Sequence, residues 1–194
     1  MILMIDYGAG NTASVANALD EIGTQFCIAK NISDVKEYEK IILPGVGEAN
    51  YAMQQLRERG FVELIKNSKV PTLGICLGMQ LFTEFSEEGE TGCIGLVNCK
   101  TIKFSNMNEK VPHMGWNNVN TKNDSILFNS IKQNEYFYFA HSFYVEESKY
   151  AVASTKHGIE FASAIENKNI YGVQFHPEKS GAAGLQLIKN FGEL

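Results

Sequence analysis

The stretch TLGICLGMQLFTEF (residues 72–85) places a cysteine between two glycines, where a strand-like run meets the helix-like run LFTEF. The pattern Gly74-x-Cys76-x-Gly78 matches the nucleophile elbow, a sharp turn from a strand into a helix that projects its central side chain from the end of a sheet. A helix beginning after Cys76 would also direct backbone N–H groups at the sulfur, which favours the thiolate and can hold an oxyanion. The pattern is short, so a buried structural cysteine in a glycine-rich turn is the alternative.

Outward from this stretch, short apolar runs alternate with amphipathic ones. The pattern predicts strands at 2–5, 25–29, 40–44 and 72–75, and helices at 11–23, 48–59 and 61–67. Such alternation, with unbroken apolar strands, predicts an α/β fold: an open, mostly parallel sheet flanked by helices.

The second half of the chain has a different texture. Short strands and polar turns dominate between residues 91 and 155, and a core strand at 169–175 and a closing helix at 184–191 follow. We therefore expect a β-rich elaboration in this half. No linker, repeat or low-complexity tract is visible, so residues 1–194 are predicted to form a single domain.

Composition excludes several classes of function. A net charge of −5 and a pI near 5.4 argue against nucleic-acid binding and against attachment to a membrane surface. No apolar run approaches the ~20 residues that span a bilayer. The cysteines form no CxxC pair and no signal peptide is evident, so we expect reduced thiols in a cytoplasmic protein. Cys93, Cys99 and His113 fit no zinc spacing, and neither a metal nor a cofactor is expected.

A thiol nucleophile needs a base, and the base needs an orienting group. His176 follows the predicted strand at 169–175, and Glu178 lies two residues further on. Since the carboxyl ends of parallel strands meet at one edge of the sheet, His176 is expected at the level of Cys76. The sequence HPE alone is also typical of a plain turn.

The turn LPGVGEA (residues 43–49) follows another predicted core strand. The backbone N–H groups of Gly45, Val46 and Gly47 could there complete an oxyanion hole with the amide of Leu77. A plain connection from strand to helix is the other interpretation, and no G-K-[ST] sequence follows that would indicate a phosphate loop.

Together, GxCxGxQ, the upstream PGxG turn and HPE near the C-terminus resemble the class I (triad) glutamine amidotransferases, which have a flavodoxin-like fold. In that family a cysteine attacks the side-chain amide of glutamine, ammonia leaves, and water releases glutamate from the thioester. The resemblance implies that Cys76 is the nucleophile, His176 the general base and then acid, and Glu178 the orienting carboxylate. Gln80 would help to hold the substrate glutamine.

Along nearly the whole chain the motifs DYGAGN, PGVG, PHMGWN and FHPEKSG are similar to one branch of the family, the glutaminase subunits of imidazole glycerol phosphate synthase in histidine biosynthesis. The resemblance implies a heterodimer with a (β/α)8-barrel cyclase subunit that receives ammonia through a channel. The cyclase would convert a phosphoribulosyl intermediate into imidazole glycerol phosphate and aminoimidazole carboxamide ribonucleotide. In this branch the oxyanion hole is complete only when the partner is loaded.

The same resemblance assigns further roles. Glu88, Ser142 and Phe143 would contact the amino-acid end of glutamine, and the cyclase would dock on Asn11, Trp116, Tyr138 and Lys179. Trp116 could equally be a core residue. Two alternatives remain: a related glutaminase subunit that feeds another acceptor, as in surface-sugar amidation, and a catalytically silent docking subunit.

Overall fold

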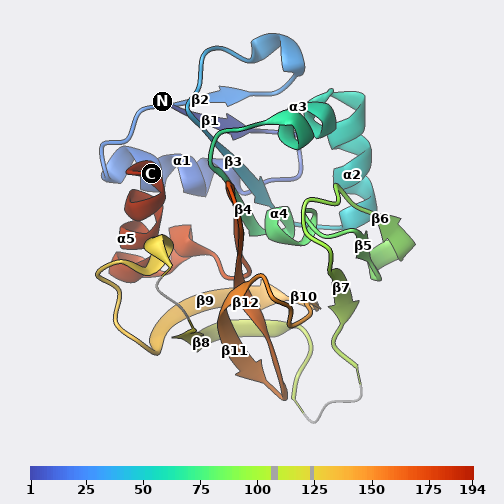
Figure 1. The fold of residues 1–194 in the computed structure, drawn as a ribbon, viewed down its shortest axis with the longest axis vertical. Helices are drawn as coiled ribbons and strands as arrows, with labels where there is room; N and C mark the ends of the chain where they lie inside the picture. Colours follow the sequence, from blue (N-terminus) through green and yellow to red (C-terminus); the bar gives the residue numbers. More distant parts are fainter. Residues whose placement is uncertain (106–108, 123–124) are drawn as a thin grey trace.

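Parallel strands form the centre of the molecule in the order β2-β1-β3-β4-β13, as the computed structural model shows for residues 1–105, 109–122 and 125–194 (Figure 1). This is the doubly wound, flavodoxin-like order. The strands are β1 (Ile2–Ile5), β2 (Phe26–Ala29), β3 (Lys40–Gly45), β4 (Thr72–Cys76) and β13 (Ile170–Val173). Their carboxyl ends share one edge, where this topology gathers functional groups.

Helices cover both faces of this sheet. Ile2 and Met4 of β1 pack into the core under α1 (Thr12–Glu21) and α5 (Gly181–Gly192), whereas Leu3 and Ile5 pack into the core under α2 (Ala49–Glu58) and α3 (Phe61–Asn67). Successive strand residues point to opposite faces, so a strand covered on both sides must be apolar throughout. The predicted α/β class is thereby confirmed.

The second half adds antiparallel strands beside β13, which Figure 1 shows below the parallel part. β12 pairs with β13, and β11 pairs with β12. β8 pairs with β11 and, along most of its length, with β9. The additional strands are β5 (Phe85–Ser86), β6 (Thr91–Gly92), β7 (Lys100–Lys103), β8 (His113–Thr121), β9 (Glu135–His141), β10 (Phe143–Val145), β11 (Ala151–His157) and β12 (Ile159–Asn167). The predicted β-rich elaboration is confirmed.

The helix after the cysteine is shorter than the sequence suggested. α4 spans only Leu77–Gln80, and the helix-like run at 81–85 instead turns into β5, so that part of the prediction is wrong. The Thr83 hydroxyl donates to the carbonyl of Gln80 at 2.7 Å and so competes with helix continuation. The remaining short helices are 3₁₀ turns: η1 (Ile32–Asp34), η2 (Glu88–Glu90), η3 (Ile126–Phe128) and η4 (Pro177–Lys179).

Within the described residues, no helix has both the length and the apolar character needed to cross a bilayer. That residues 1–194 form one domain stays a prediction.

Candidate active site

Cys76 is the last residue of β4 and occupies the elbow that the sequence predicted. Its backbone has φ 53° and ψ −108°, a conformation that residues other than glycine rarely adopt and that costs about 1–3 kcal/mol. The side chain is nearly buried, with 5% of the residue exposed. Strain held at a buried thiol between a strand and a helix is the geometry expected of a nucleophile elbow.

The two glycines flanking Cys76 are required by close backbone packing. A Cβ on Gly78 would lie 1.9 Å from the carbonyl oxygen of Leu43 on β3, and a Cβ on Gly74 would lie 2.6 Å from the backbone of Gly78. No side chain fits at either place, because such contacts are far inside van der Waals separation. The glycines therefore let the elbow sit directly on the neighbouring strand.

His176 and Glu178 come together in the 3₁₀ turn after β13. His176 Nδ1 and Glu178 Oε1 are 2.8 Å apart, and both side chains are almost completely buried. The His176 amide also donates to the carbonyl of Tyr138 at 2.8 Å, which anchors the turn to β9. Burial opposes a charged imidazole, but the negative charge of Cys76, a hydrogen bond with it, and Glu178 together raise the pKa of His176 to about 10. The site thus favours a protonated imidazole at His176, beside the sulfur of Cys76.

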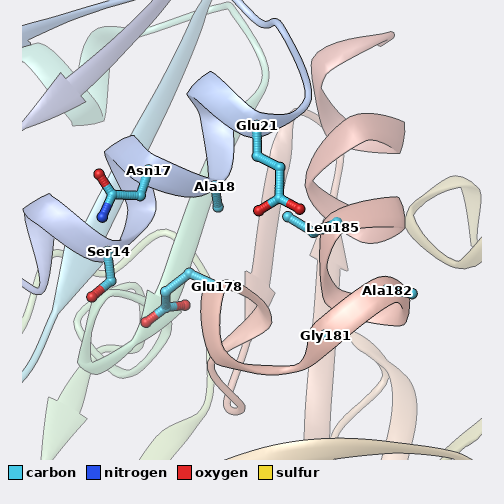
Figure 2. Close-up of a pocket in the computed structure, with 8 residues that line it drawn as sticks. All are labelled: Ser14, Asn17, Ala18, Glu21, Glu178, Gly181, Ala182 and Leu185. Atoms are coloured by element: carbon cyan, nitrogen blue, oxygen red, sulfur yellow. The ribbon is translucent and has the colours of Figure 1, made fainter.

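Glu178 has a further partner in Asn11. Asn11 Nδ2 donates to the same Oε1 at 2.9 Å, while Oε2 has no hydrogen-bond partner among the described residues. Glu178 also lines a second cavity of about 490 Å³, where α1 and the beginning of α5 lie side by side (Figure 2). The carboxylate is therefore held from the α1 side as well as by His176.

A cavity of about 220 Å³ opens over Cys76 and gathers most of the predicted site residues. Its walls come from the ends of β4 and β9, the turn after β3 and the turn after β13. The lining residues are Val46, Gly47, Cys76, Leu77, Gln80, Glu88, Ala140, His141, Ser142, Phe143, His176 and Lys179. Gly45 lies beneath the cavity against the elbow, since a Cβ there would be 2.7 Å from the amide of Gly78.

The predicted oxyanion-hole donor Val46 is engaged elsewhere in this structure. Its backbone N–H donates to the carbonyl of Ala9 at 2.9 Å, although its residue lines the cavity. Gly47, the next residue, has φ +95°, a conformation that glycine adopts without strain. The predicted hole is therefore incomplete in this conformation, because Val46 could contribute its N–H only after a change in the peptide between Gly45 and Val46.

Gln80 and Glu88 line the cavity, but their side chains also form hydrogen bonds with other groups of the protein. Gln80 Nε2 donates to the carbonyl of Phe143 at 2.8 Å and to Gln174 Oε1 at 3.0 Å. Glu88 Oε2 accepts the amide N–H of Ala49 at 2.8 Å, and burial raises the pKa of Glu88. Hydrogen bonds to the Gln80 amide nitrogen orient its carboxamide oxygen as the atom that can accept from a ligand.

The residues predicted to meet a partner fall into two groups. Trp116 and Tyr138 are cross-strand neighbours on the outer face of β8 and β9, with ring centroids 6.2 Å apart, and Lys179 Nζ lies 5.9 Å from the Tyr138 ring. Trp116 is 56% exposed and is therefore not a core residue. Asn11 instead directs its side-chain amide to Glu178.

Two features of the site were not predicted from the sequence. Gln174 is fully buried, and its Nε2 lies 3.7 Å from Cys76 Sγ. His113 Nδ1 and His141 Nε2 are 2.9 Å apart, with the ring of His157 stacked on that of His113. A glutamine inside the apolar strand run IYGVQF was the available signal for the first; the second depends on strand pairing that the sequence does not reveal.

No group of histidine, cysteine or acidic residues in the described part of the chain has the arrangement of a metal site. All four cysteines, each of which the structure describes, are free thiols. Burial raises the pKa of Cys93 and of Cys99 to about 11, so neither is activated as a nucleophile.

Comparisons with known proteins show what the whole chain is similar to. The family described as "Glutamine amidotransferase class-I" matches residues 3–193. The chain is 46% identical to the "Imidazole glycerol phosphate synthase subunit HisH" of Haemophilus influenzae, over 99% of this chain and 96% of that protein. It is 48% identical to the protein of the same name from Sulfurimonas denitrificans, over 98% and 97%. The crystal structure of a putative GMP synthase subunit from Thermoplasma acidophilum has the same fold, with a TM-score of 0.76 at 21% identity over 99% of this chain and 92% of that one.

Proposed function

Because the chain belongs to the class I glutamine amidotransferase family, we propose that Cys76, His176 and Glu178 form its catalytic triad. The chain is the glutaminase subunit of an imidazole glycerol phosphate synthase: it hydrolyses glutamine to glutamate and ammonia, and the ammonia feeds a cyclase subunit in histidine biosynthesis. The observation that carries the triad is that the strained elbow of Cys76 and the imidazole of His176 line one cavity, with Glu178 buried behind the imidazole.

The geometry supports the first half of the reaction directly. The Cys76 thiolate attacks the side-chain amide carbon of glutamine, and the carbonyl oxygen becomes an oxyanion beside the amide of Leu77. The amide of Val46 joins it once released from the carbonyl of Ala9. His176, whose pKa is raised to about 10, carries the proton that the leaving nitrogen needs. Ammonia departs as the carbon–nitrogen bond breaks, and a glutamyl thioester remains on Cys76.

The second half reverses the role of the histidine. His176, now neutral, removes a proton from water, and the resulting hydroxide attacks the thioester carbon. The carbon–sulfur bond breaks, glutamate leaves, and the Cys76 thiolate and the His176 imidazolium are restored. Glu178 holds the Nδ1 side of the ring throughout, which keeps Nε2 directed at the reacting atoms.

Glutamine would be recognised by the walls of the same cavity. Gln80 offers its carboxamide oxygen, and Ser142 and Phe143 line the cavity where the amino-acid end of the substrate would lie. Glu88 would attract the α-amino group, although its carboxylate also binds the amide of Ala49. These contacts suit a small zwitterion with an amide side chain.

The cyclase partner would be a (β/α)8 barrel docked on Trp116, Tyr138 and Lys179, in a cytoplasmic heterodimer. This surface joins the active site, since the carbonyl of Tyr138 accepts the His176 amide and Lys179 lines the cavity. Partner contact could therefore be transmitted to the triad. Release of Val46 from Ala9 would complete the oxyanion hole when the loaded partner binds.

The test is glutamate formation by the lone chain and by the chain with its cyclase, with and without the cyclase ligand. Cys76→Ala is expected to reduce turnover by more than about a thousandfold while leaving the fold and complex formation intact. Cys27→Ala is the matched control, since Cys27 lies on β2 away from the cavity.

Unchanged glutamate production by Cys76→Ala would overturn the mechanism, and an inactive wild-type complex would support a silent docking subunit instead. Stimulation by a different acceptor system, and not by the cyclase, would favour a related pathway such as sugar amidation.

A further inference from the structure

Gln174 lies between the nucleophile and a residue of the glutamine pocket. It follows β13 directly, two positions before His176, and none of its surface is exposed. Its Nε2 donates toward Cys76 Sγ at 3.7 Å, and its Oε1 accepts from Gln80 Nε2 at 3.0 Å. A buried carboxamide in an apolar strand is costly unless its polar atoms are satisfied, and here both ends are.

The orientation of this carboxamide is determined by a chain of hydrogen bonds. The backbone carbonyl of Phe143 can only accept, so the side-chain atom of Gln80 that lies 2.8 Å from it must be the NH₂ group. That NH₂ group also faces Gln174, which must present its oxygen there. The NH₂ group of Gln174 is consequently directed at the sulfur.

If the carboxamide of Gln174 were rotated so that its NH₂ group and its oxygen exchanged places, both of its contacts would become unfavourable. Its NH₂ group would face the NH₂ group of Gln80, and its oxygen would face the sulfur of Cys76. Two donors would then meet, and an oxygen lone pair would lie against a thiolate. The network therefore favours one orientation, and that orientation suits a negatively charged sulfur because hydrogen bonds to an ionised acceptor are stronger than those to a neutral one.

We propose that Gln174 is a further catalytic residue, whose carboxamide N–H stabilises the Cys76 thiolate while Gln80 holds the carboxamide in the donating orientation. The inference rests on the proposed function, in which Cys76 is the nucleophile. His176 supplies charge on one side of the sulfur, and Gln174 supplies an uncharged donor from within the sheet. The two contributions differ in kind, because the donor from Gln174 persists when His176 has given up its proton.

The structure offers a substitution that separates the two contacts of Gln174. Gln174→Glu keeps an oxygen for Gln80 but replaces the donor beside Cys76 with a second oxygen. Gln174→Met has a similar size and loses both contacts. The readouts are the pH dependence of Cys76 alkylation by iodoacetamide in the full-length chain, followed on the Cys76 peptide by mass spectrometry, and kcat and KM for glutamine with the cyclase bound.

In both variants the alkylation midpoint is expected to move up by about one pH unit, and kcat is expected to fall about tenfold to a hundredfold. KM should rise in Gln174→Met, which releases Gln80, and change less in Gln174→Glu. Asn190→Leu is the control for loss of a buried carboxamide. Asn190 donates to the carbonyls of Leu127 and Asn129, away from the cavity, so its removal should lower the melting temperature and leave the midpoint unchanged.

Wild-type midpoints and kcat values in folded Gln174→Glu and Gln174→Met would overturn this inference. A raised KM with an unchanged midpoint would do the same, since it would reduce Gln174 to a support for Gln80. If Gln174→Met does not fold, an unchanged midpoint in Gln174→Glu still overturns the inference, because that variant both removes the donor and adds a carboxylate beside the sulfur. Cys76→Ala in parallel separates the two proposals: if that variant remains active, the proposed function fails, and if it is inactive while the Gln174 variants behave as wild type, only the role of Gln174 fails.

Discussion

Asn11 and Glu178, 167 residues apart in the sequence, are joined by a 2.9 Å hydrogen bond between Nδ2 and Oε1. The same oxygen is 2.8 Å from His176 Nδ1. The side-chain amide of Asn11, just before α1, therefore holds the carboxylate that contacts the imidazole of His176, and it couples the first turn after β1 to the proposed triad.

Replacing Asn11 with alanine should impair catalysis even in the lone chain. Loss of a hydrogen bond to a buried carboxylate is expected to lower kcat for glutamine about tenfold, with KM little changed. The measurement is glutamate release without the cyclase. If the kcat of the lone chain is unaltered and only the affinity for the cyclase falls, Asn11 is an interface residue and its hydrogen bond to Glu178 does not contribute to catalysis.

The hydrogen bond from Val46 to Ala9 should be detectable in solution. The Val46 amide is expected to exchange slowly with deuterium in the lone chain, because its proton is held by the Ala9 carbonyl. Binding of the loaded cyclase should change its exchange rate and increase glutaminase turnover together. Equal turnover with and without the partner would contradict an oxyanion hole that is completed when the partner docks.

Gly78→Ala should destabilise the fold severely. The new methyl group would meet the carbonyl oxygen of Leu43 at 1.9 Å, so β3 and α4 would have to separate, at an expected cost of more than about 3 kcal/mol in the free energy of unfolding. Urea denaturation measures this change. Gly92→Ala is the matched control, since nothing lies within 4 Å of its Cβ position, and it should stay within about 0.5 kcal/mol of wild type.

The histidine cluster beneath β8 and β9 should make the fold sensitive to mild acid. Burial lowers the pKa of His113 to about 4 and that of His141 to about 3, and the neighbouring charge of His157 contributes to both shifts. Because the unfolded chain binds these protons at a pKa near 6.5, their contribution is present above that pH and is lost as the pH falls.

We expect the free energy of unfolding to decrease below pH 6.5 by up to about 1.4 kcal/mol per pH unit for each histidine. Urea denaturation between pH 7 and pH 5 tests this, with His113→Gln expected to have a shallower slope than wild type. Glu88 and Glu166, whose pKa values are raised by burial, act in the opposite direction and are common to both proteins. Identical slopes would refute the role of His113.

Trp116→Ala should weaken the complex without affecting the lone chain. A large exposed aromatic ring beside Tyr138 is the kind of residue that anchors an interface, and its removal is expected to raise Kd for the cyclase about thirtyfold, or about 2 kcal/mol. Ile28→Ala serves as control, because Ile28 is similarly exposed but lies on β2. Titration calorimetry would distinguish them, and equal Kd values would exclude Trp116 from the interface.

The sequence predicted the parallel sheet, the elbow and the position of the histidine because each depends on local pattern. Cys76 needs glycines on both sides, and His176 needs only to follow a strand next to β4 in the sheet. Periodicity and turn chemistry are visible over a few residues, so they can be recognised before the chain is folded.

What escaped prediction depends on tertiary packing. Gln174 meets Gln80 across 94 residues of sequence, and the bond from Val46 to Ala9 depends on how two turns pack together. The short α4 was also missed, since LFTEF has helical periodicity but Thr83 bonds back to the carbonyl of Gln80. Hydrogen bonds between distant segments leave no mark in local composition.

The alternation along β8 has a consequence for variation in this protein. Trp116 and Met114 point outward, whereas His113 and Val119 are buried on the other side of the same strand. If the cyclase docks on this face as proposed, neighbouring residues of β8 are under different selective constraints, one set by the surface of the cyclase and one by the interior of this chain. When the two proteins diverge between lineages, compensating changes should be confined to every second residue of this strand.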